Sequence, residues 1–406
     1  MKNIVVAGAG FGGVRCALDL AFYLKNFSDY KIVVFDQNLY HLYTPSLYEV
    51  ATAEIQKRCV CLPYQHLFDG KQISFIHAKI DKIDAQEKIV KLVNGDRIPY
   101  EFLVLALGGT TDYFGISGLE KCSFGLKSLR EAVGLRNHLR EVFQKAKTDS
   151  SEQLKEDLRI VVGGGGFSGV ELAGELIVYV NRLSQEYRLD PRKVALVLVE
   201  ASLNLLPGLS EKISNLAKIR LEKLGVKILT QAGIAEVKND LLILANGHVL
   251  PTATIIWAGG IRAAQVIEES GMMVDKKGRL TVDENLRSLE RKEIFALGDN
   301  ACFIDQKTGN PVPGQAEAAI DQGNLIAKNI IASISGRPLK KYYPKISGFI
   351  IPIGGNYAIA SVFGIIFTGY LAMALKKLIE LRYLLSILPP LKALRVFSHE
   401  AQLLLE

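Results

Sequence analysis

Residues 160–176 read IVVGGGGFSGVELAGEL, in which a short apolar run leads into four consecutive glycines. A similar arrangement, IVVAGAGFGGVRCALDL, occupies residues 4–20. In both stretches a buried strand is expected to end in a glycine turn that opens a helix. This strand–turn–helix unit is typical of dinucleotide-binding folds, and the chain contains it twice.

The first glycine loop has the spacing Gly8-x-Gly10-x-x-Gly13. The first glycine permits a tight turn, the second lets the backbone approach a pyrophosphate, and the third lets helix and strand pack closely. The next strand, Lys31–Phe35, ends at Asp36, whose carboxylate can accept hydrogen bonds from ribose hydroxyls. A glycine-rich turn without a ligand is the alternative, and the surrounding pattern favours a dinucleotide site.

The second loop places the same motif at Gly164, Gly166 and Gly169, and its closing acid is Glu200. A carboxylate at that point would repel the 2′-phosphate of NADPH. Residues 201–206, ASLNLL, contain no lysine or arginine that could bind such a phosphate. The sequence therefore favours NADH over NADPH. The alternative is that Glu200 is a surface glutamate without a role.

Similar features follow both loops. After the first come alternating segments around Asn94-Gly95, expected to form a small antiparallel meander over Gln72–Ile98, and then the buried strand FLVLALGG at residues 102–109. After the second come a hairpin at Asn246-Gly247 and TIIWAGG at residues 254–260. A whole domain is therefore repeated.

These patterns predict an α/β protein with two Rossmann-like dinucleotide-binding domains, the second inserted into the first, followed by a C-terminal α+β region. Residues 127–157 are expected to form a charged, helical connecting segment on the surface. The predicted domain limits are 1–115 and 266–340 for the discontinuous first domain, 116–265 for the second domain with its connector, and 341–406 for the C-terminal region.

The C-terminal region has no charged residue over the 30 residues Ile346–Leu375. Glycines and a proline interrupt this stretch, so Ser347–Phe363 is expected to form a strand pair. A Leu-rich helix is expected over Ile365–Leu388 and a last amphipathic segment over Leu391–Leu405. A basic, amphipathic helix of this kind is typical of a peripheral membrane anchor, and a dimer interface is the alternative. No clean set of spanning helices is expected, so the sequence does not support proton pumping.

The 406-residue chain has a net charge of +7 and no Lys/Arg-rich block with interleaved aromatics, so nucleic acid is not an expected partner. Its cysteines are few and scattered, which argues against a disulfide framework. The pair Cys59 and Cys61 has no second cluster at ligand spacing, so no metal site is predicted. The five cysteines are Cys16, Cys59, Cys61, Cys122 and Cys302.

Two dinucleotide sites in one chain suggest a bound flavin and a nicotinamide. Several stretches resemble known proteins: the two glycine loops, HLYTPSLYEVATAE at residues 41–54, VEASLNLLPGLSEKIS at 199–214, TIIWAGGIRA from 254, and IFALGDNA at 294–301. Together they resemble the two-dinucleotide-binding-domain flavoproteins, and among these the type II NADH dehydrogenases. Dithiol reductases of this fold need a cysteine pair beside the flavin, and residues 41–54 contain none.

The resemblance implies FAD, NADH and reduction of a quinone, at the cytoplasmic face of a membrane. The residues implied for FAD are Gly8, Gly10, Phe11, Gly12, Gly13, Asp36, Pro45, Gly108 and Asp299. Those implied for NADH are Gly164, Gly166, Phe167, Gly169, Glu200 and Gly259. A soluble NADH-dependent reductase of another acceptor, such as a ferredoxin-like protein, and a flavin-binding redox sensor without turnover remain alternatives.

The catalytic residue implied by the resemblance is Glu171, near the nicotinamide. An acid expected in the first turn of a helix is also favoured by the helix dipole alone, which is the alternative for this residue. The quinone-side motif of the family usually reads Ala-Gln-x-Ala-x-Gln. Here residues 316–321 read AEAAID, so both glutamines become acids. The quinone-side residues implied are Ala316, Glu317, Ala319 and Ile320.

Overall fold

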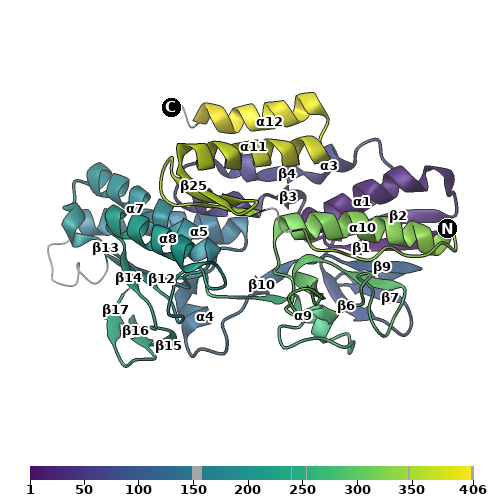
Figure 1. Cartoon of the computed structure of the whole chain (residues 1–406), viewed down its shortest axis with the longest axis horizontal. Coiled ribbons are helices and arrows are strands. Elements are labelled where there is room, and N and C mark those ends of the chain that lie inside the picture. The colour runs from purple at the N-terminus through teal and green to yellow at the C-terminus, as the bar shows by residue number, and fades with distance from the viewer. Residues whose placement is uncertain (149–157, 239, 253, 346–347, 404–406) are drawn as a thin grey trace.

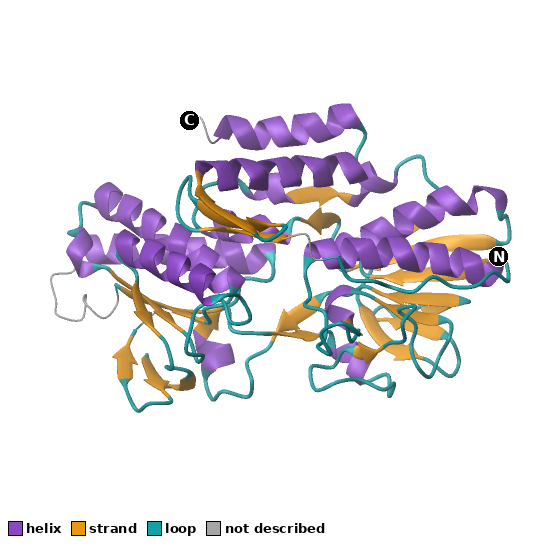
Figure 2. Cartoon of the chain, viewed as in Figure 1, coloured by secondary structure: helices purple, strands orange, loops and turns teal. Residues whose placement is uncertain are grey.

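The computed structural model of the chain describes residues 1–148, 158–238, 240–252, 254–345 and 348–403. Two α/β halves lie side by side, and two C-terminal helices lie above the junction between them (Figure 1). In this view the long helices of both halves lie above their sheets (Figure 2).

The first half is built on a five-stranded parallel sheet in the order β21-β9-β1-β2-β5. Its central strand β1 follows from an apolar run whose residues Ile4 to Ala7 are fully buried. Helices α1 and α10 pack against each other over this sheet (Figure 1). The bounds are β1 (Lys2–Ala7), α1 (Phe11–Tyr23), β2 (Tyr30–Asp36), β5 (Ile73–His77), β9 (Phe102–Leu105), β21 (Ile294–Ala296) and α10 (Ala316–Ile334).

The second half has a parallel sheet in the order β11-β18-β12-β13-β14. The order β18-β12-β13-β14 repeats β9-β1-β2-β5, which confirms the tandem repeat. Strand β21 joins the first sheet after the whole second half, so the first half is discontinuous as predicted. The bounds are β11 (Ser123–Phe124), β12 (Arg159–Gly163), α7 (Phe167–Tyr187), β13 (Ala195–Val199), α8 (Glu211–Leu224), β14 (Lys227–Leu229) and β18 (Thr254–Trp257).

The predicted meander over Gln72–Ile98 is wrong at its beginning. Its first strand, β5, pairs in parallel with β2 and forms the edge of the main sheet. Alternating, half-buried side chains fit an edge strand as well as a meander strand, so the pattern could not separate the two. The remaining strands form the antiparallel sheet, and the second half has a matching sheet. They are β6 (Ile80–Asp84), β7 (Ile89–Leu92) and β8 (Arg97–Pro99), then β15 (Ile234–Lys238), β16 (Leu241–Leu244) and β17 (Val249–Pro251).

Two short antiparallel strands, β10 (Gly109–Thr111) and β19 (Ile261–Ala263), join the halves where each buried strand ends in glycines. The domain limits themselves stay a prediction. The other short elements are η1 (Leu24–Asn26), β3 (Tyr40–Leu42), η2 (Thr44–Ser46), α2 (Leu47–Ala51), η3 (Lys57–Val60), β4 (Cys61–Pro63), α3 (Tyr64–Phe68), α4 (Leu119–Cys122), η4 (Pro191–Lys193), α9 (Gln265–Glu268), β20 (Leu280–Thr281), η5 (Gly298–Asn300) and β22 (Ala301–Cys302).

The segment predicted as a surface connector at residues 127–157 is largely the helix α5 (Leu129–Thr148). Its apolar side chains at helical spacing are buried, so α5 is part of the core and not only a connector. The charges that dominate its composition lie on the other side. Residues 149–157 of the prediction lie outside the described residues.

The C-terminal region has three antiparallel strands and two helices, with the bounds β23 (Gly348–Pro352), β24 (Ala358–Val362), β25 (Ile365–Gly369), α11 (Tyr370–Ile387) and α12 (Pro390–Leu403). The helix predicted from Ile365 therefore begins five residues later. Phe363 and Gly364 both have positive φ, 47° and 83°, and form a two-residue turn that pairs β25 with β24. No described helix is long and apolar enough to cross a bilayer.

Candidate active site

The first glycine loop leaves β1 and opens α1, as the motif predicts. Gly8 has φ +99°, and a Cβ there would lie 2.3 Å from the Ala106 carbonyl oxygen. A Cβ on Gly13 would lie 2.0 Å from the Gly8 carbonyl oxygen. These two glycines are therefore required by the fold, whereas a Cβ on Gly10 would meet no protein atom within 4 Å.

Gly12 allows a close approach between α1 and α10. A Cβ there would lie 2.4 Å from Cδ1 of Leu297 and 2.5 Å from the carbonyl oxygen of Ala319. On the other side, a Cβ on Gly323 of α10 would lie 2.4 Å from the Gly12 carbonyl oxygen. The two helices α1 and α10 thus approach each other at glycines. This contact brings the first turn of α10 to the glycine loop.

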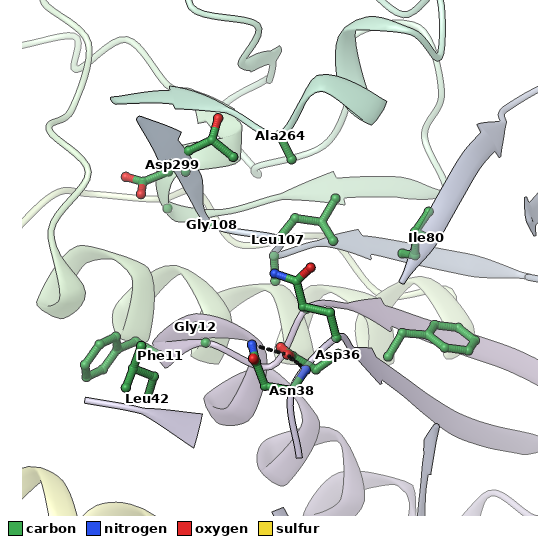
Figure 3. A pocket seen from close by; sticks show the side chains of 18 of the residues that line it. Phe11, Gly12, Asp36, Asn38, Leu42, Ile80, Leu107, Gly108, Ala264 and Asp299 are labelled. Atoms are coloured by element: carbon green, nitrogen blue, oxygen red, sulfur yellow. Dashed lines mark hydrogen bonds between the residues drawn. The ribbon is translucent and has the colours of Figure 1, made fainter. Parts of the chain in front are cut away.

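A cavity of about 730 Å³ opens between this loop, β9 and the start of α10. Of the residues predicted for FAD, it is lined by Gly8, Gly10, Phe11, Gly12, Asp36, Gly108 and Asp299. Gly13 packs on Gly8 instead, and Thr44 lines the cavity in place of the predicted Pro45. Asp36 and Asp299 lie on opposite sides of Leu107 and Gly108 (Figure 3).

The two aspartates that line the cavity have different surroundings. Asp36 accepts hydrogen bonds from the backbone N–H groups of Ala9, at 2.9 Å, and Asn38, at 2.8 Å. The Asp299 carboxylate lies between two glycines: a Cβ would approach it to 2.8 Å from Gly109 and to 1.9 Å from Gly314. A glycine-lined cavity with a carboxylate at each of two places suits an elongated dinucleotide with ribose hydroxyls, so these residues fit FAD.

The second loop reproduces the first. Gly164 has φ +103°, and a Cβ there would lie 2.5 Å from Cα of Gly259. A Cβ on Gly169 would lie 1.8 Å from the Gly164 carbonyl oxygen, while Gly166 again has open space. The predicted residue Phe167 opens α7 and packs edge-on against Phe349 of β23, with ring centroids 5.7 Å apart.

Glu200 occupies the place of Asp36 in the second half. It accepts hydrogen bonds from the N–H groups of Gly165, at 2.5 Å, and Ser202, at 2.7 Å. Its side chain is buried, so the reading of Glu200 as a surface glutamate is wrong. Its negative charge is fixed beside the loop that would receive a nicotinamide dinucleotide.

Glu171 belongs to a cluster of titratable groups from three helices. Lys376 of α11 forms a buried ion pair with Glu49 of α2 and donates a hydrogen bond to the Tyr48 hydroxyl at 2.8 Å. The Tyr48 hydroxyl donates to Glu49 at 3.0 Å. Glu171 and Glu175 of α7 interact electrostatically with this group. We name these five residues the lysine–glutamate cluster.

The acids of this cluster have divergent pKa values. Burial would raise the pKa of Glu49, but the charges of Lys376 and Lys377 outweigh it and lower this pKa to about 2. Burial raises the pKa of Glu171 to about 8, against the opposing charge of Lys376. Burial and the charge of Glu49 raise the pKa of Glu175 to about 7. At neutral pH Glu49 is therefore a carboxylate while Glu171 carries a proton.

The helix-dipole reading of Glu171 does not apply. Helix α7 begins at Phe167 and has no acid in its first turn, so Glu171 lies in the second turn. Sequence reasoning missed the partners of Glu171, in particular Lys376 and Glu49. The charged residues within this Leu-rich helix were a weak signal for them, because a buried lysine needs a partner.

The residues predicted for the quinone side lie at the start of α10. Ala316 and Ala319 line the cavity, and Glu317 follows in the first turn. Burial and the charge of Asp321 raise the pKa of Glu317, against Arg382. Gln322, next to the altered motif, accepts a hydrogen bond from the Gly298 N–H at 2.7 Å and so fixes the turn before Asp299. Cys302 is a buried free thiol on β22.

Comparison with known proteins agrees with this architecture. The family model described as pyridine nucleotide-disulphide oxidoreductase matches residues 2–323. The type II NADH:quinone oxidoreductases of Staphylococcus haemolyticus (strain JCSC1435) and Staphylococcus aureus (strain NCTC 8325 / PS 47) are each 31% identical to the chain, over 94% of it and 94% of their own length.

Solved structures show the same fold. The structure of NDH2 from Plasmodium falciparum in complex with NADH matches with a TM-score of 0.88 at 17% identity, over 100% of this chain and 97% of that one. The sulfide:quinone oxidoreductase from Aquifex aeolicus matches with a TM-score of 0.79 at 21% identity, over 98% and 92%. With these relatives, the chain belongs to the pyridine nucleotide-disulphide oxidoreductases and, within them, to the type II NADH:quinone oxidoreductase family.

Proposed function

We propose that the protein is a non-proton-pumping NADH:quinone oxidoreductase that takes a hydride from NADH and passes two electrons to a membrane quinone. The observation that carries this function is the pair of glycine loops. Each keeps two glycines that the fold requires and a third glycine at whose Cβ position the protein leaves open space. Relatives that match 94% of the chain carry the same functional name.

The first loop and its cavity would hold FAD, which when bound supplies the two-electron chemistry that side chains lack. The chain contributes N–H groups at the start of α1, a ribose acceptor at Asp36, and Asp299 at the far side of the cavity. The second loop would hold NADH, with Gly164, Gly166 and Gly169 at the pyrophosphate and Glu200 at the ribose. Phe167 and Gly259 flank that loop.

A direct experiment tests the electron path. NADH is added anaerobically to the purified protein, the flavin absorbance is followed, and a short-chain quinone is then added. Loss of the absorbance followed by recovery supports both halves of the function. Loss without recovery keeps the NADH half and points to another acceptor, such as a ferredoxin-like protein. Loss with NADPH but not NADH contradicts the assignment of Glu200.

The nucleotide preference provides a further prediction. We expect NADH to be strongly preferred over NADPH, because the fixed carboxylate of Glu200 repels a 2′-phosphate. A Glu200→Gln variant is expected to narrow the ratio of the kcat/KM values for NADH and NADPH at least about fivefold, since two like charges about 4 Å apart repel by about 1 kcal/mol even in bulk water. Steady-state kinetics with both nucleotides measure this ratio. An unchanged ratio would place the 2′-hydroxyl elsewhere.

Glu171 is proposed as the proton-handling residue. Its raised pKa keeps a proton on the carboxyl at neutral pH, and its neighbours Tyr48, Glu49 and Lys376 connect it to the C-terminal helix α11. A carboxylic acid near pH 7 is suited to donate a proton and to be reprotonated. The bound acceptor would draw its proton from this carboxyl.

A Glu171→Gln variant is expected to lower quinone turnover about 100-fold, because general acid catalysis of this kind contributes about 10²- to 10⁴-fold. The wild-type rate should fall as pH rises through about 8, where Glu171 loses its proton. This fall of the turnover rate with rising pH should be absent from the variant. The rate of flavin reduction by NADH, measured by stopped flow, should change little. Full quinone turnover in the variant would remove Glu171 from the mechanism.

We assign the acceptor side to the start of α10, at Ala316, Glu317, Ala319 and Ile320. The raised pKa of Glu317 favours a protonated carboxyl, which can donate a hydrogen bond to a quinone carbonyl as a glutamine amide does. The acid that replaces the amide in this motif can therefore donate the same hydrogen bond whenever it carries its proton.

The C-terminal region supports a peripheral position on a membrane. Its exposed apolar side chains, with exposed fractions from 61% to 84%, are Phe363, Ile365, Tyr370, Leu371, Leu378 and Leu391. Helix α11 buries Lys376 and Glu380 instead, the reverse of a helix that faces water. We propose that this surface lies on the cytoplasmic face of a membrane. Binding to lipid vesicles tests it, and a stable dimer that covers this surface without vesicle binding would favour the homodimer.

A further inference from the structure

The carbonyl group of Ala9, inside the first glycine loop, accepts two side-chain hydrogen bonds. Nδ1 of the buried His41 lies 3.2 Å from this oxygen, and the Tyr64 hydroxyl donates to it at 2.9 Å. The N–H of the same residue donates to Asp36. The two peptides that flank the Cα of Ala9 are thus both held, because the N–H of the first and the carbonyl of the second are each bonded to side chains.

His41 connects this loop to the C-terminal helix α11. Its Nε2 lies 2.7 Å from the hydroxyl of Tyr383. A carbonyl oxygen can only accept, so Nδ1 must carry the proton and Nε2 must accept from the tyrosine. Burial lowers the pKa of His41 to about 4, which keeps the ring neutral at physiological pH. One directed series therefore runs from the Tyr383 hydroxyl through His41 to the Ala9 carbonyl.

The rings around this series form a compact group. Phe11, the first residue of α1 and a lining residue of the cavity, contacts both His41 and Tyr383, with ring centroids 5.0 Å and 4.9 Å away. Arg15, one turn further along α1, donates to the Ser386 carbonyl of α11 at 3.0 Å. Helix α11 thus contacts the glycine loop and the start of the following helix together.

In the second glycine loop, the corresponding carbonyl group has a different hydrogen-bond partner. The residue equivalent to Ala9 is Gly165, and its carbonyl accepts from the backbone N–H of Leu206 at 2.8 Å. Its N–H donates to Glu200, as that of Ala9 does to Asp36. The two loops therefore share the contact between an N–H group and an acid, and they differ in the partner of the carbonyl group. The carbonyl of the first loop is linked to a C-terminal helix, and that of the second to its own half.

We propose that Tyr383 and His41 are positioning residues through which helix α11 keeps the first glycine loop in its dinucleotide-binding shape, so that seating of α11 and retention of the dinucleotide are coupled. The inference rests on the proposed assignment of FAD to this loop. Coupling of this kind is reciprocal: FAD that prefers the held loop also stabilises the seated helix.

The test compares FAD binding by apoprotein of the wild type and of Tyr383→Phe. The variant is expected to bind FAD about tenfold more weakly, the loss typical of one buried hydrogen bond. FAD titration followed by flavin fluorescence measures the affinity. Hydrogen exchange of the α11 amides with and without FAD measures the coupling, and FAD should slow this exchange less in the variant. A merely structural role of Tyr383 would change exchange equally in both states.

Tyr370→Phe is the matched control, because it removes the same hydroxyl from an exposed residue of the same helix. His41→Asn is the second variant, since its amide can still reach the Ala9 carbonyl but not Tyr383, and it should behave like Tyr383→Phe. Wild-type affinity and wild-type coupling in both variants overturn the inference while leaving the proposed function intact. A wild-type chain that binds no FAD overturns the proposed function and the inference together.

Discussion

A Gly10→Ala variant is expected to fold normally and to contain no FAD. The position suits alanine, since its φ is −71° and a Cβ would meet no protein atom within 4 Å. The added methyl group instead occupies the side on which the backbone approaches a pyrophosphate. We expect the affinity for FAD to fall at least about 100-fold, which corresponds to about 2.8 kcal/mol. Flavin content after purification and reconstitution measures the loss.

The equivalent change in the second loop separates the two sites. Gly166 also has open space around its Cβ position. A Gly166→Ala variant should therefore keep its flavin and lose NADH-driven reduction, again about 100-fold at low NADH concentration. Gly134→Ala on α5 is the control, because it adds the same methyl group in open space away from both loops. Loss of flavin in Gly166→Ala with retention in Gly10→Ala would reverse the assignment of the loops.

The glycine loops could be predicted from the sequence because their physics is local. A turn from strand to helix with φ near +100° needs glycine at its first position, and close packing needs it again five residues later. Both conditions are met at Gly8 with Gly13 and at Gly164 with Gly169. The order of features after each loop then predicted the repeated sheet, because parallel strands joined by helices follow a restricted topology.

The errors arose where a local pattern fits two structures. Residues 365–369 are apolar and precede a helix, so the pattern did not separate a strand from the first helical turns. The turn at Phe363 and Gly364 makes these residues a strand. It includes a positive φ at Phe363, which is uncommon for residues other than glycine. Strand β5 was misplaced for a similar reason, because its partner β2 lies about forty residues away in the chain.

The lysine–glutamate cluster lay beyond sequence reasoning because its partners are distant. Lys376 and Glu49 are separated by 327 positions, and Tyr383 and His41 by 342. No spacing rule connects such residues, and only the seating of α11 across both halves brings them together. Glu171 was found by resemblance, whereas the causes of its raised pKa, burial and the charge of Glu49 against the opposing charge of Lys376, became visible only in three dimensions.

Replacing Lys376 by methionine is expected to destabilise the fold strongly. The lysine and Glu49 are only 10% and 8% exposed, so the substitution leaves a buried carboxylate without its cation. Removing one partner of a buried ion pair costs about 3–5 kcal/mol. We expect the thermal midpoint to fall by about 10 °C, given that 1 kcal/mol shifts the Tm of a domain of about 150–250 residues by about 2–4 °C. Lys392→Met, at an exposed position of α12, should change it little.

The pH dependence and a second substitution identify the cause. The pKa of Glu49 in the folded protein, about 2, lies below its ordinary value of 4.5, so its stabilising contribution is present above pH 4.5 and lost as pH falls toward 2. The deficit of Lys376→Met should therefore be large at pH 7 and shrink as pH falls, because the unpaired buried carboxyl takes a proton in the variant and the wild type loses the contribution of Glu49 below pH 4.5. Adding Glu49→Gln removes the buried charge and should restore most of the lost stability at pH 7. A deficit that is equal at all pH values and remains in the double variant would show that lost packing around the lysine stem, and not the stranded charge, destabilises the protein.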